Sequence, residues 1–255
     1  MKKTNKKKLN KKRIILLIFI VILIFYLYNN VLLKFDITSD FNQIMNISDN
    51  YKIIKQDTNK NYPGKGQEKV KNKDGYFTTF TTEDNYKKTY IEYKQNGNSS
   101  WSNKEYWGGT ISENGCGITV MSIILSGYGK DYSPEDLRKK YYPVMDYENL
   151  SSELSSTYNI KNSGFYYDST HLSNKSILEH LRSNRPIIVC VWNQPSNNRW
   201  TTASHYMTLL AADDNNMVYV SNPNGLENDS KSSGWYNINE VSPYIAKALY
   251  ITDYK

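Results

Sequence analysis

The sequence predicts an α+β domain, with helices followed by an antiparallel sheet, behind an N-terminal transmembrane helix. Three observations support this prediction. An apolar run covers residues 14–33, helical spacing of apolar residues dominates between positions 116 and 184, and β-type runs dominate beyond position 185. Helices and strands that are segregated along the chain are typical of α+β domains.

The N-terminus has the layout of a membrane anchor. Residues 1–13 contain eight Lys and Arg and no acid, and residues 14–33 are apolar except for two asparagines. A cleaved signal peptide shares this layout, but no small-residue cleavage site follows, so we favour an uncleaved signal anchor. The basic segment should stay in the cytoplasm by the positive-inside rule. We therefore expect a single-pass protein of the cell membrane with an extracellular domain after Lys34.

The charge of the chain follows from this anchor. The net charge is +7, but setting the eight N-terminal cations aside reduces the 32 basic residues to 24, against 25 acidic ones. The remainder is therefore close to neutral. We predict no nucleic-acid partner, because the basicity serves membrane topology.

The region between anchor and domain is polar. Residues 34–74 are rich in Asn, Asp, Lys and Gln with little apolar periodicity, which predicts an extracellular spacer, with a pro-segment as the alternative. Tyr, Thr and Phe then appear in YFTTFTT and YKKTYIEYKQ, two candidate strands separated by EDN. We place the folded domain at residues 75–255.

Helices are predicted in the first part of this domain and strands in the second. A helix beginning at Cys116 would place Ile118, Met121, Ile124, Leu125 and Tyr128 on one face, with glycines at its end. A capping residue followed by proline, SPED at 133–136, starts a second helix, and residues 173–184 form a third. The runs PIIVCVW, HYMTLLAA, MVYVSNP and KALYITDY predict strands.

Cys116 lies between two glycines at the predicted start of a helix. Unpaired backbone N–H groups and the positive end of the helix dipole favour a thiolate there. Gly115 and Gly117 would let a substrate backbone approach closely. We therefore consider Cys116 a candidate nucleophile.

A nucleophilic thiol needs a base, and the chain has three histidines. We expect His171, in a polar stretch, and His180, on a helix, to lie on the surface. His205 begins a β-run after a polar loop, and Asn222 follows seventeen residues later, after a turn and another strand. Adjacent antiparallel strands could bring them together, with Asn222 fixing the imidazole tautomer. Cys, His and Asn thus occur in the order that a thiol peptidase needs.

Spacing alone leaves structural alternatives open. Cys116 could be a small core residue, His205 a hydrogen-bonded strand histidine, and Asn222 a turn residue before Pro223. A disulfide between Cys116 and Cys190 is another alternative in an extracellular domain, although the apolar strand around Cys190 favours a buried thiol. Two cysteines and scattered histidines lack zinc-ligand spacing. We therefore predict no metal and no cofactor.

The segments around these residues resemble a bacterial enzyme family. YKQNGNSSWSNKEYWGGTISENGCGITVMSIILSGYGKDYSPEDL, ILEHLRSNRPIIVCVW, SHYMTLLAADDNNMVYVSNP and GWYNINEV are similar to the papain-like cysteine peptidases of the bacteriocin-processing, double-glycine type, over roughly residues 90–252. The resemblance implies a papain-like fold with Cys116 as nucleophile, His205 as base and Asn222 as orienting residue. It also implies that Gln95 donates to the oxyanion together with the backbone N–H of Cys116.

The chain departs from this family in two ways. The third residue is commonly Asp in a DP pair where this chain has Asn222, and no transporter is attached. The resemblance implies hydrolysis of peptide or amide bonds in a peptide or protein substrate, including cell-wall peptides. A peptidoglycan peptide hydrolase or an acyltransferase on the same site, and a non-catalytic surface interaction module, are the alternatives.

Overall fold

The computed structural model describes residues 64–72, 74–82, 87–97, 99–193, 199–225 and 231–253. The chain divides into two units, residues 1–61 and 62–255, and every described residue belongs to the second. The predicted basic segment 1–13 and membrane segment 14–33 lie outside the described residues. Within the described ranges, no helix has both the length and the apolar character needed to cross a membrane.

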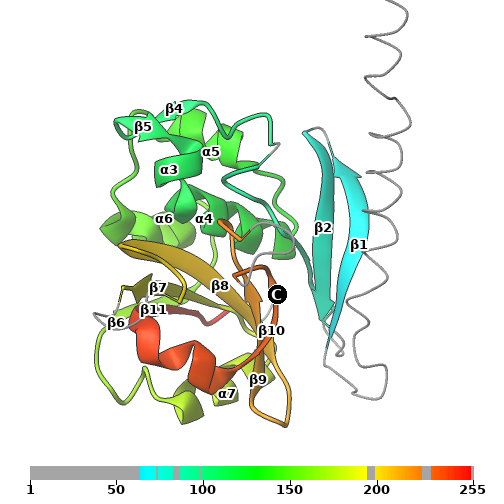
Figure 1. Cartoon of the computed structure of the whole chain (residues 1–255), viewed down its shortest axis with the longest axis vertical. Coiled ribbons are helices and arrows are strands. Elements are labelled where there is room, and N and C mark those ends of the chain that lie inside the picture. Colours follow the sequence, from blue (N-terminus) through cyan, green and yellow to red (C-terminus); the bar gives the residue numbers. More distant parts are fainter. Residues whose placement is uncertain are drawn as a thin grey trace, which may run out of the picture. The chain divides into compact units, whose positions relative to one another are not determined.

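The described chain alternates short helices with strands and ends in a run of strands (Figure 1). The α-helices are α3 (Ile111–Asn114), α4 (Cys116–Gly127), α5 (Pro134–Lys140), α6 (Leu150–Ser156) and α7 (Asn174–Arg182). The 3-10 helices are η1 (Tyr147–Asn149), η2 (Ile238–Glu240) and η3 (Ser242–Tyr244). The strands are β1 (Gly64–Asn72), β2 (Gly75–Thr82), β3 (Thr89–Ile91), β4 (Glu105–Tyr106), β5 (Gly109–Thr110), β6 (Asn162–Tyr166), β7 (Ile187–Trp192), β8 (Ser204–Ala212), β9 (Met217–Ser221), β10 (Gly234–Asn237) and β11 (Ile245–Ile251).

The main sheet of the described region has six strands in the order β10-β9-β8-β7-β11-β6. All of its pairs are antiparallel, so β8 and β9 form a hairpin and β11 inserts between β7 and β6. A second sheet joins β1, β2 and β3. The α+β prediction, with helices followed by an antiparallel sheet, is therefore confirmed.

Each face of the main sheet is covered by a different helix (Figure 1). On one face α4 packs in a core that includes Ile188, Tyr206 and Leu210. On the other face α7 packs in a core that includes Val189 and Met207. Neighbouring residues of one strand thus enter different cores, as the alternation of side chains along a strand requires.

Helix α4 is more deeply buried than the sequence suggests. The spacing predicts one apolar face, but every residue from 117 to 125 is buried. The reason is that α4 contacts β8, β3, α5 and α6, so protein surrounds it. Two polar residues are tolerated inside it because the hydroxyl groups of Thr119 and Ser122 donate to the carbonyl oxygens of Gly115 and Ile118.

The folded region begins earlier than predicted. Residues 64–72, which we expected in the spacer, form strand β1, and β1 pairs with β2 along its length. Main-chain hydrogen bonds hold such a strand without an apolar alternation, so the sequence pattern does not reveal it. The two predicted strands at 76–82 and 86–95 do pair, as β2 and β3.

His180 is buried, contrary to our expectation that it lies on the surface. Its ring lies 4.6 Å from the ring of Tyr250 on β11, between centroids. Burial, with the charge of Arg185 as the second cause, lowers the pKa of His180 from 6.5 to about 4. The histidine is therefore part of the packing between α7 and the sheet.

We expect Gly127→Ala to destabilise the domain. A Cβ atom at position 127 would lie 2.1 Å from Cε1 of Tyr90, a fully buried ring, so the helix or the ring must shift. Overpacking of this kind costs about 1–3 kcal/mol. Chemical denaturation measures the loss, and Glu179→Ala on the exposed side of α7 is the control, expected within about 0.5 kcal/mol of the parent. Equal stability of both variants would contradict the packing at Gly127.

Acid should destabilise the domain partly through His180. Since the folded pKa is about 4 and the ordinary value is 6.5, the unfolded chain binds the proton more tightly. The contribution of neutral His180 is therefore present above pH 6.5 and is lost as the pH falls toward about 4, by on the order of 2–3 kcal/mol. His180→Phe should flatten the profile of stability against pH in this window. Identical profiles of stability against pH for the parent and for His180→Phe would contradict this prediction.

Candidate active site

Cys116 is the first residue of α4. Gly115 serves both as the C-terminal cap of α3 and as the N-cap of α4, so two helices meet immediately before the thiol. A Cβ atom on Gly115 would lie 2.5 Å from the carbonyl oxygen of Ile111. Only glycine therefore allows α3 to come this close to the start of α4.

The glycine on the other side of the thiol has a different role from the one predicted. We expected Gly117 to leave room for a substrate backbone, but the ring of Tyr147 fills this space. A Cβ atom on Gly117 would lie 2.3 Å from Cε1 of Tyr147. The hydroxyl of Tyr147 donates to the carbonyl oxygen of Asn114 at 2.6 Å. Tyr147 thus packs against the beginning of α4.

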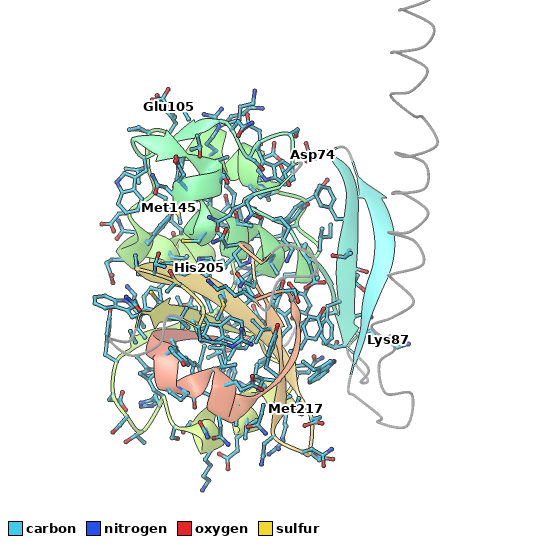
Figure 2. All side chains as sticks on the ribbon, in the orientation of Figure 1. Asp74, Lys87, Glu105, Met145, His205 and Met217 are labelled. Carbon is cyan, nitrogen blue, oxygen red and sulfur yellow. The ribbon has the colours of Figure 1, made fainter. Side chains whose placement is uncertain are left out.

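His205 and Asn222 are in contact, as the spacing predicts. His205 is the second residue of β8, and Asn222 directly follows β9, the neighbouring strand. Nε2 of His205 and Oδ1 of Asn222 are 2.7 Å apart, and both residues are buried. Figure 2 shows His205 where the helices meet the sheet.

The hydrogen bonds of Asn222 determine the tautomer of His205. Nδ2 of Asn222 donates to the carbonyl oxygen of Lys231 at 2.8 Å, and Oδ1 also accepts from the backbone N–H of Asn224 at 3.0 Å. The oxygen of the amide must therefore face His205, and Nε2 of the ring carries the hydrogen. Nδ1 is then the ring nitrogen that can accept a proton.

The thiol of Cys116 lies at the same end of β8 as His205. Helix α4 packs against β8, and the backbone amide of Tyr206, the residue after His205, acts on the Cys116 thiol and favours its thiolate. Tyr206 and His205 are consecutive residues of β8, so the Cys116 thiol lies beside the residue that follows His205.

Gln95 lies between the other two parts of the site. Its side chain is buried, and Nε2 donates to the carbonyl oxygen of Ser112 in α3, at 2.8 Å. Its backbone N–H donates to the carbonyl oxygen of Pro223, the residue after Asn222, at 2.9 Å. One amide hydrogen of Gln95 is thereby used, and the second is the one that can serve an oxyanion.

Burial determines the protonation of the site. It raises the pKa of Cys116 to about 11, against the lowering effect of the backbone amides of Tyr206 and Gly117. It lowers the pKa of His205 to about 4, against the effect of Asn222 and with the help of Lys231 and Lys94. The prediction that the helix N-terminus lowers the thiol pKa is therefore wrong for this state, because desolvation outweighs the helix amides. Both the thiol of Cys116 and the imidazole of His205 are therefore neutral near pH 7.

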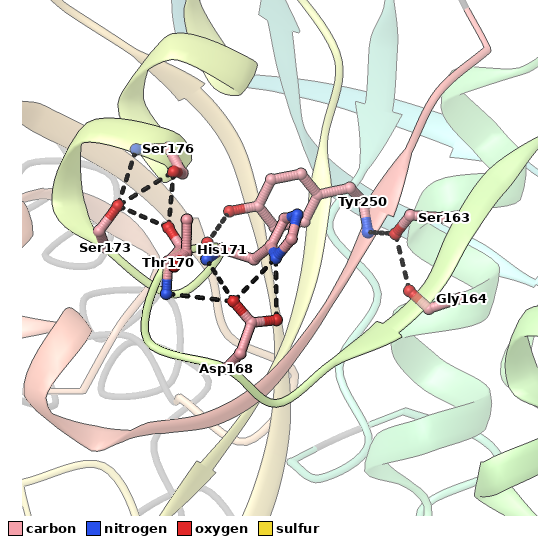
Figure 3. A network of polar contacts seen from close by, with 8 residues as sticks. All are labelled: Ser163, Gly164, Asp168, Thr170, His171, Ser173, Ser176 and Tyr250. Atoms are coloured by element: carbon pink, nitrogen blue, oxygen red, sulfur yellow. Dashed lines mark hydrogen bonds and ion pairs between the residues drawn. The ribbon is translucent and has the colours of Figure 1, made fainter.

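The other cysteine and histidines lie elsewhere. Cys190 is buried in β7, and both cysteines are free, so the predicted buried thiol is confirmed and the disulfide alternative is not. His171 is partly exposed, as expected. It pairs through Nδ1 with Asp168 at 2.8 Å, and its carbonyl oxygen accepts a hydrogen bond from the Tyr250 hydroxyl (Figure 3). Its ring also stacks on Tyr166.

Two residues of this region carry no sequence signal. Lys94 precedes Gln95, and Ser233 follows the Asn222 turn, and both contact the main chain of Asn222. A lysine and a serine in polar segments are normally exposed, so only the three-dimensional contacts reveal them. Among the described residues, no group of three or more His, Cys, Asp or Glu side chains could hold a metal ion.

Comparison with solved structures finds several similar chains, among them two peptidases. The first is the peptidase domain of Streptococcus ComA, described as a bifunctional ABC transporter involved in a quorum-sensing pathway. It is 16% identical with a TM-score of 0.39, covering 54% of this chain and 91% of that one. A putative C39-like peptidase from Bacillus anthracis is 10% identical with a TM-score of 0.41, covering 55% and 90%. A search of curated proteins gives no match.

Comparison with models of protein families gives a match that covers more of the chain. The model of the Peptidase_C39 like family matches residues 87–243, which is more than half of the chain and includes every candidate site residue named above. The chain therefore belongs to the Peptidase_C39 like family and is a cysteine peptidase.

Proposed function

We propose that this peptidase hydrolyses peptide or amide bonds with Cys116 as nucleophile, His205 as base, Asn222 as orienting residue and Gln95 as oxyanion donor. The observation that carries the proposal is the 2.7 Å hydrogen bond between His205 and Asn222, at the end of β8 against which the start of α4 packs. That contact leaves Nδ1 of His205 able to accept the thiol proton.

The chemical steps follow from these roles. Sγ of Cys116 attacks the substrate carbonyl carbon while Nδ1 of His205 takes the thiol proton, and the carbonyl electron pair moves onto oxygen. The side-chain N–H of Gln95 and the backbone N–H of Cys116 donate to this oxyanion. The C–N bond then breaks, the leaving amine takes the proton from His205, and a thioester remains on Cys116. Water, deprotonated by His205, hydrolyses the thioester and releases the acid.

The opposite pKa shifts describe the resting state of this proposed site. The pKa of Cys116 is raised to about 11 and that of His205 lowered to about 4, so the proton rests on sulfur before substrate binds. Transfer to the imidazole becomes favourable only when the attack places negative charge on the substrate oxygen. Proton transfer and attack are thereby coupled.

The location is a further part of the proposal. We infer that residues 14–33 anchor the chain in the cell membrane and that the peptidase unit lies outside the cell. The apolar length, the eight preceding cations and the absence of a small-residue cleavage site support this inference. The substrate would then be an extracellular peptide or protein, a class that includes cell-wall peptides.

Alkylation and turnover should separate the roles of the four residues in the full-length chain. An epoxide-type thiol inhibitor should label Cys116, and Cys116→Ala should abolish labelling. His205→Ala should slow it by about 10²-fold or more, since the thiol loses its base. Asn222→Ala should slow it less. Gln95→Ala should leave alkylation, which forms no oxyanion, unchanged but slow amide cleavage by about 10²–10³.

Two matched variants control this experiment. His171→Ala removes a histidine with its own carboxylate partner, and Cys190→Ala removes the other thiol. Neither should change labelling of Cys116. The proposed site is rejected if the folded chain resists labelling and His205→Ala behaves like His171→Ala.

Fractionation of expressing cells should test the location. The full-length chain should sediment with membranes, and protease added to intact cells should digest the peptidase unit, because residues 14–33 are long enough to span the bilayer. A variant that lacks residues 14–33 should leave the membrane fraction. Recovery of a shortened soluble form that begins at about residue 30 would show cleavage and reject the anchor.

A further inference from the structure

The main chain of Asn222 is held by side chains rather than by a strand partner. Asn222 follows the last residue of β9. Its backbone N–H donates to Oγ of Ser233 at 3.0 Å, and its carbonyl oxygen accepts from Nζ of Lys94 at 2.6 Å. Both polar groups of this main chain thus bond side chains from two other segments, and the carbonyl oxygen also accepts from the backbone N–H of Gly225, at the longer distance of 3.3 Å.

Lys94 and Ser233 also contact each other. Nζ of Lys94 donates to Oγ of Ser233 at 2.8 Å, so the ammonium group, the hydroxyl and the main chain of Asn222 form one closed cluster. The hydroxyl accepts from both the amide and the ammonium. Removing either side chain would therefore disturb the contacts of the other.

Burying the charged ammonium group of Lys94 costs free energy. The ammonium group is enclosed, although the side chain as a whole is only partly buried. This burial lowers the pKa of Lys94, against the opposing charge of Glu92. A buried cation is tolerated where it makes good hydrogen bonds, and both of the acceptors named above belong to the Asn222 cluster.

The two residues after Lys94 also bond to the turn that follows Asn222. The backbone N–H of Gln95 donates to the carbonyl oxygen of Pro223, and Nδ2 of Asn96 donates to the carbonyl oxygen of Asn224 at 3.0 Å. Lys94 is the member of this series that reaches Asn222 itself. The segment that carries the oxyanion donor therefore also positions the orienting residue.

We propose that Lys94, acting with Ser233, is a positioning residue that fixes the main chain of Asn222 and thereby the orientation of the His205 ring. This inference rests on the roles proposed above for His205 and Asn222. Lys94 acts through Asn222 and does not itself touch the reacting atoms. Its charge also acts on the base, because Lys94 and Lys231 are the cations that oppose protonation of His205, while Asn222 favours it.

The test is the rate of Cys116 alkylation by iodoacetamide in the full-length chain, measured over the pH range in which His205 titrates. Lys94→Met should lower the rate about tenfold, the usual effect of losing one charge-assisted hydrogen bond. The acid limb of the profile should move to higher pH, because removal of a cation makes protonation of His205 easier. Lys88→Met is the matched control, since Lys88 is also a buried lysine whose Nζ donates to a backbone carbonyl, that of Asn184. Lys88→Met should change neither the rate nor the profile.

A double variant distinguishes positioning from a general loss of structure. In an Asn222→Ala background, Lys94→Met should cause little further loss, because the residue through which it acts is gone. Equal losses in both backgrounds, or a Lys94→Met chain that reacts like the parent, would overturn the proposal. If Lys94→Met does not fold, Ser233→Ala decides, with the same direction of effect and the same dependence on Asn222.

The outcome for Lys94 is separable from the outcome for the proposed function. If parent and His205→Ala alkylate at equal rates, the catalytic assignment fails. If His205→Ala is slow while both Lys94→Met and Ser233→Ala match the parent, only the positioning role is refuted.

Discussion

The packing of α4 against β8 is the contact on which the candidate site depends. Helix α4 begins at Cys116 and β8 carries His205 near its start, so their packing determines where Cys116 lies relative to His205. Complete burial of residues 117–125 leaves this helix little freedom to move. Glycine at 115 and at 117 lets Ile111 and Tyr147 pack closely around its first turn. The precision of the site therefore comes from the core.

Burial of this site also determines the protonation states of Cys116 and His205. A helix N-terminus favours a thiolate, yet the enclosed thiol of Cys116 has its pKa raised to about 11. The enclosed imidazole of His205 has its pKa lowered to about 4. Both changes have the same physical cause, which is the cost of a charge away from water. With these pKa values, Cys116 and His205 are both neutral in the free enzyme near pH 7.

The sequence predicts the contact between His205 and Asn222 better than it predicts the surroundings of the site. Helical and β-type spacing identify α4, α5, α7 and the main-sheet strands β7, β8, β9 and β11, but not β6 or β10. The order of Cys116, His205 and Asn222 predicts the contact between the last two. Strand β1 was missed because main-chain pairing holds it without an apolar pattern. The burial of His180 was missed because helix periodicity does not reveal a neighbour such as Tyr250 on a distant strand.

Buried polar groups are concentrated around Asn222. Burying them costs free energy, which suggests a role other than stabilising the fold. Gln95, His205 and Asn222 are buried, and the enclosed ammonium of Lys94 lies against the Asn222 carbonyl. An apolar residue at position 94 would avoid the desolvation of a cation, so stability alone does not favour lysine. An apolar side chain, however, would leave the carbonyl oxygen of Asn222 without this donor, next to the residue that orients His205. In the role proposed for Lys94, the lysine holds Asn222 in place next to His205 at a cost in stability, an exchange that active sites commonly make.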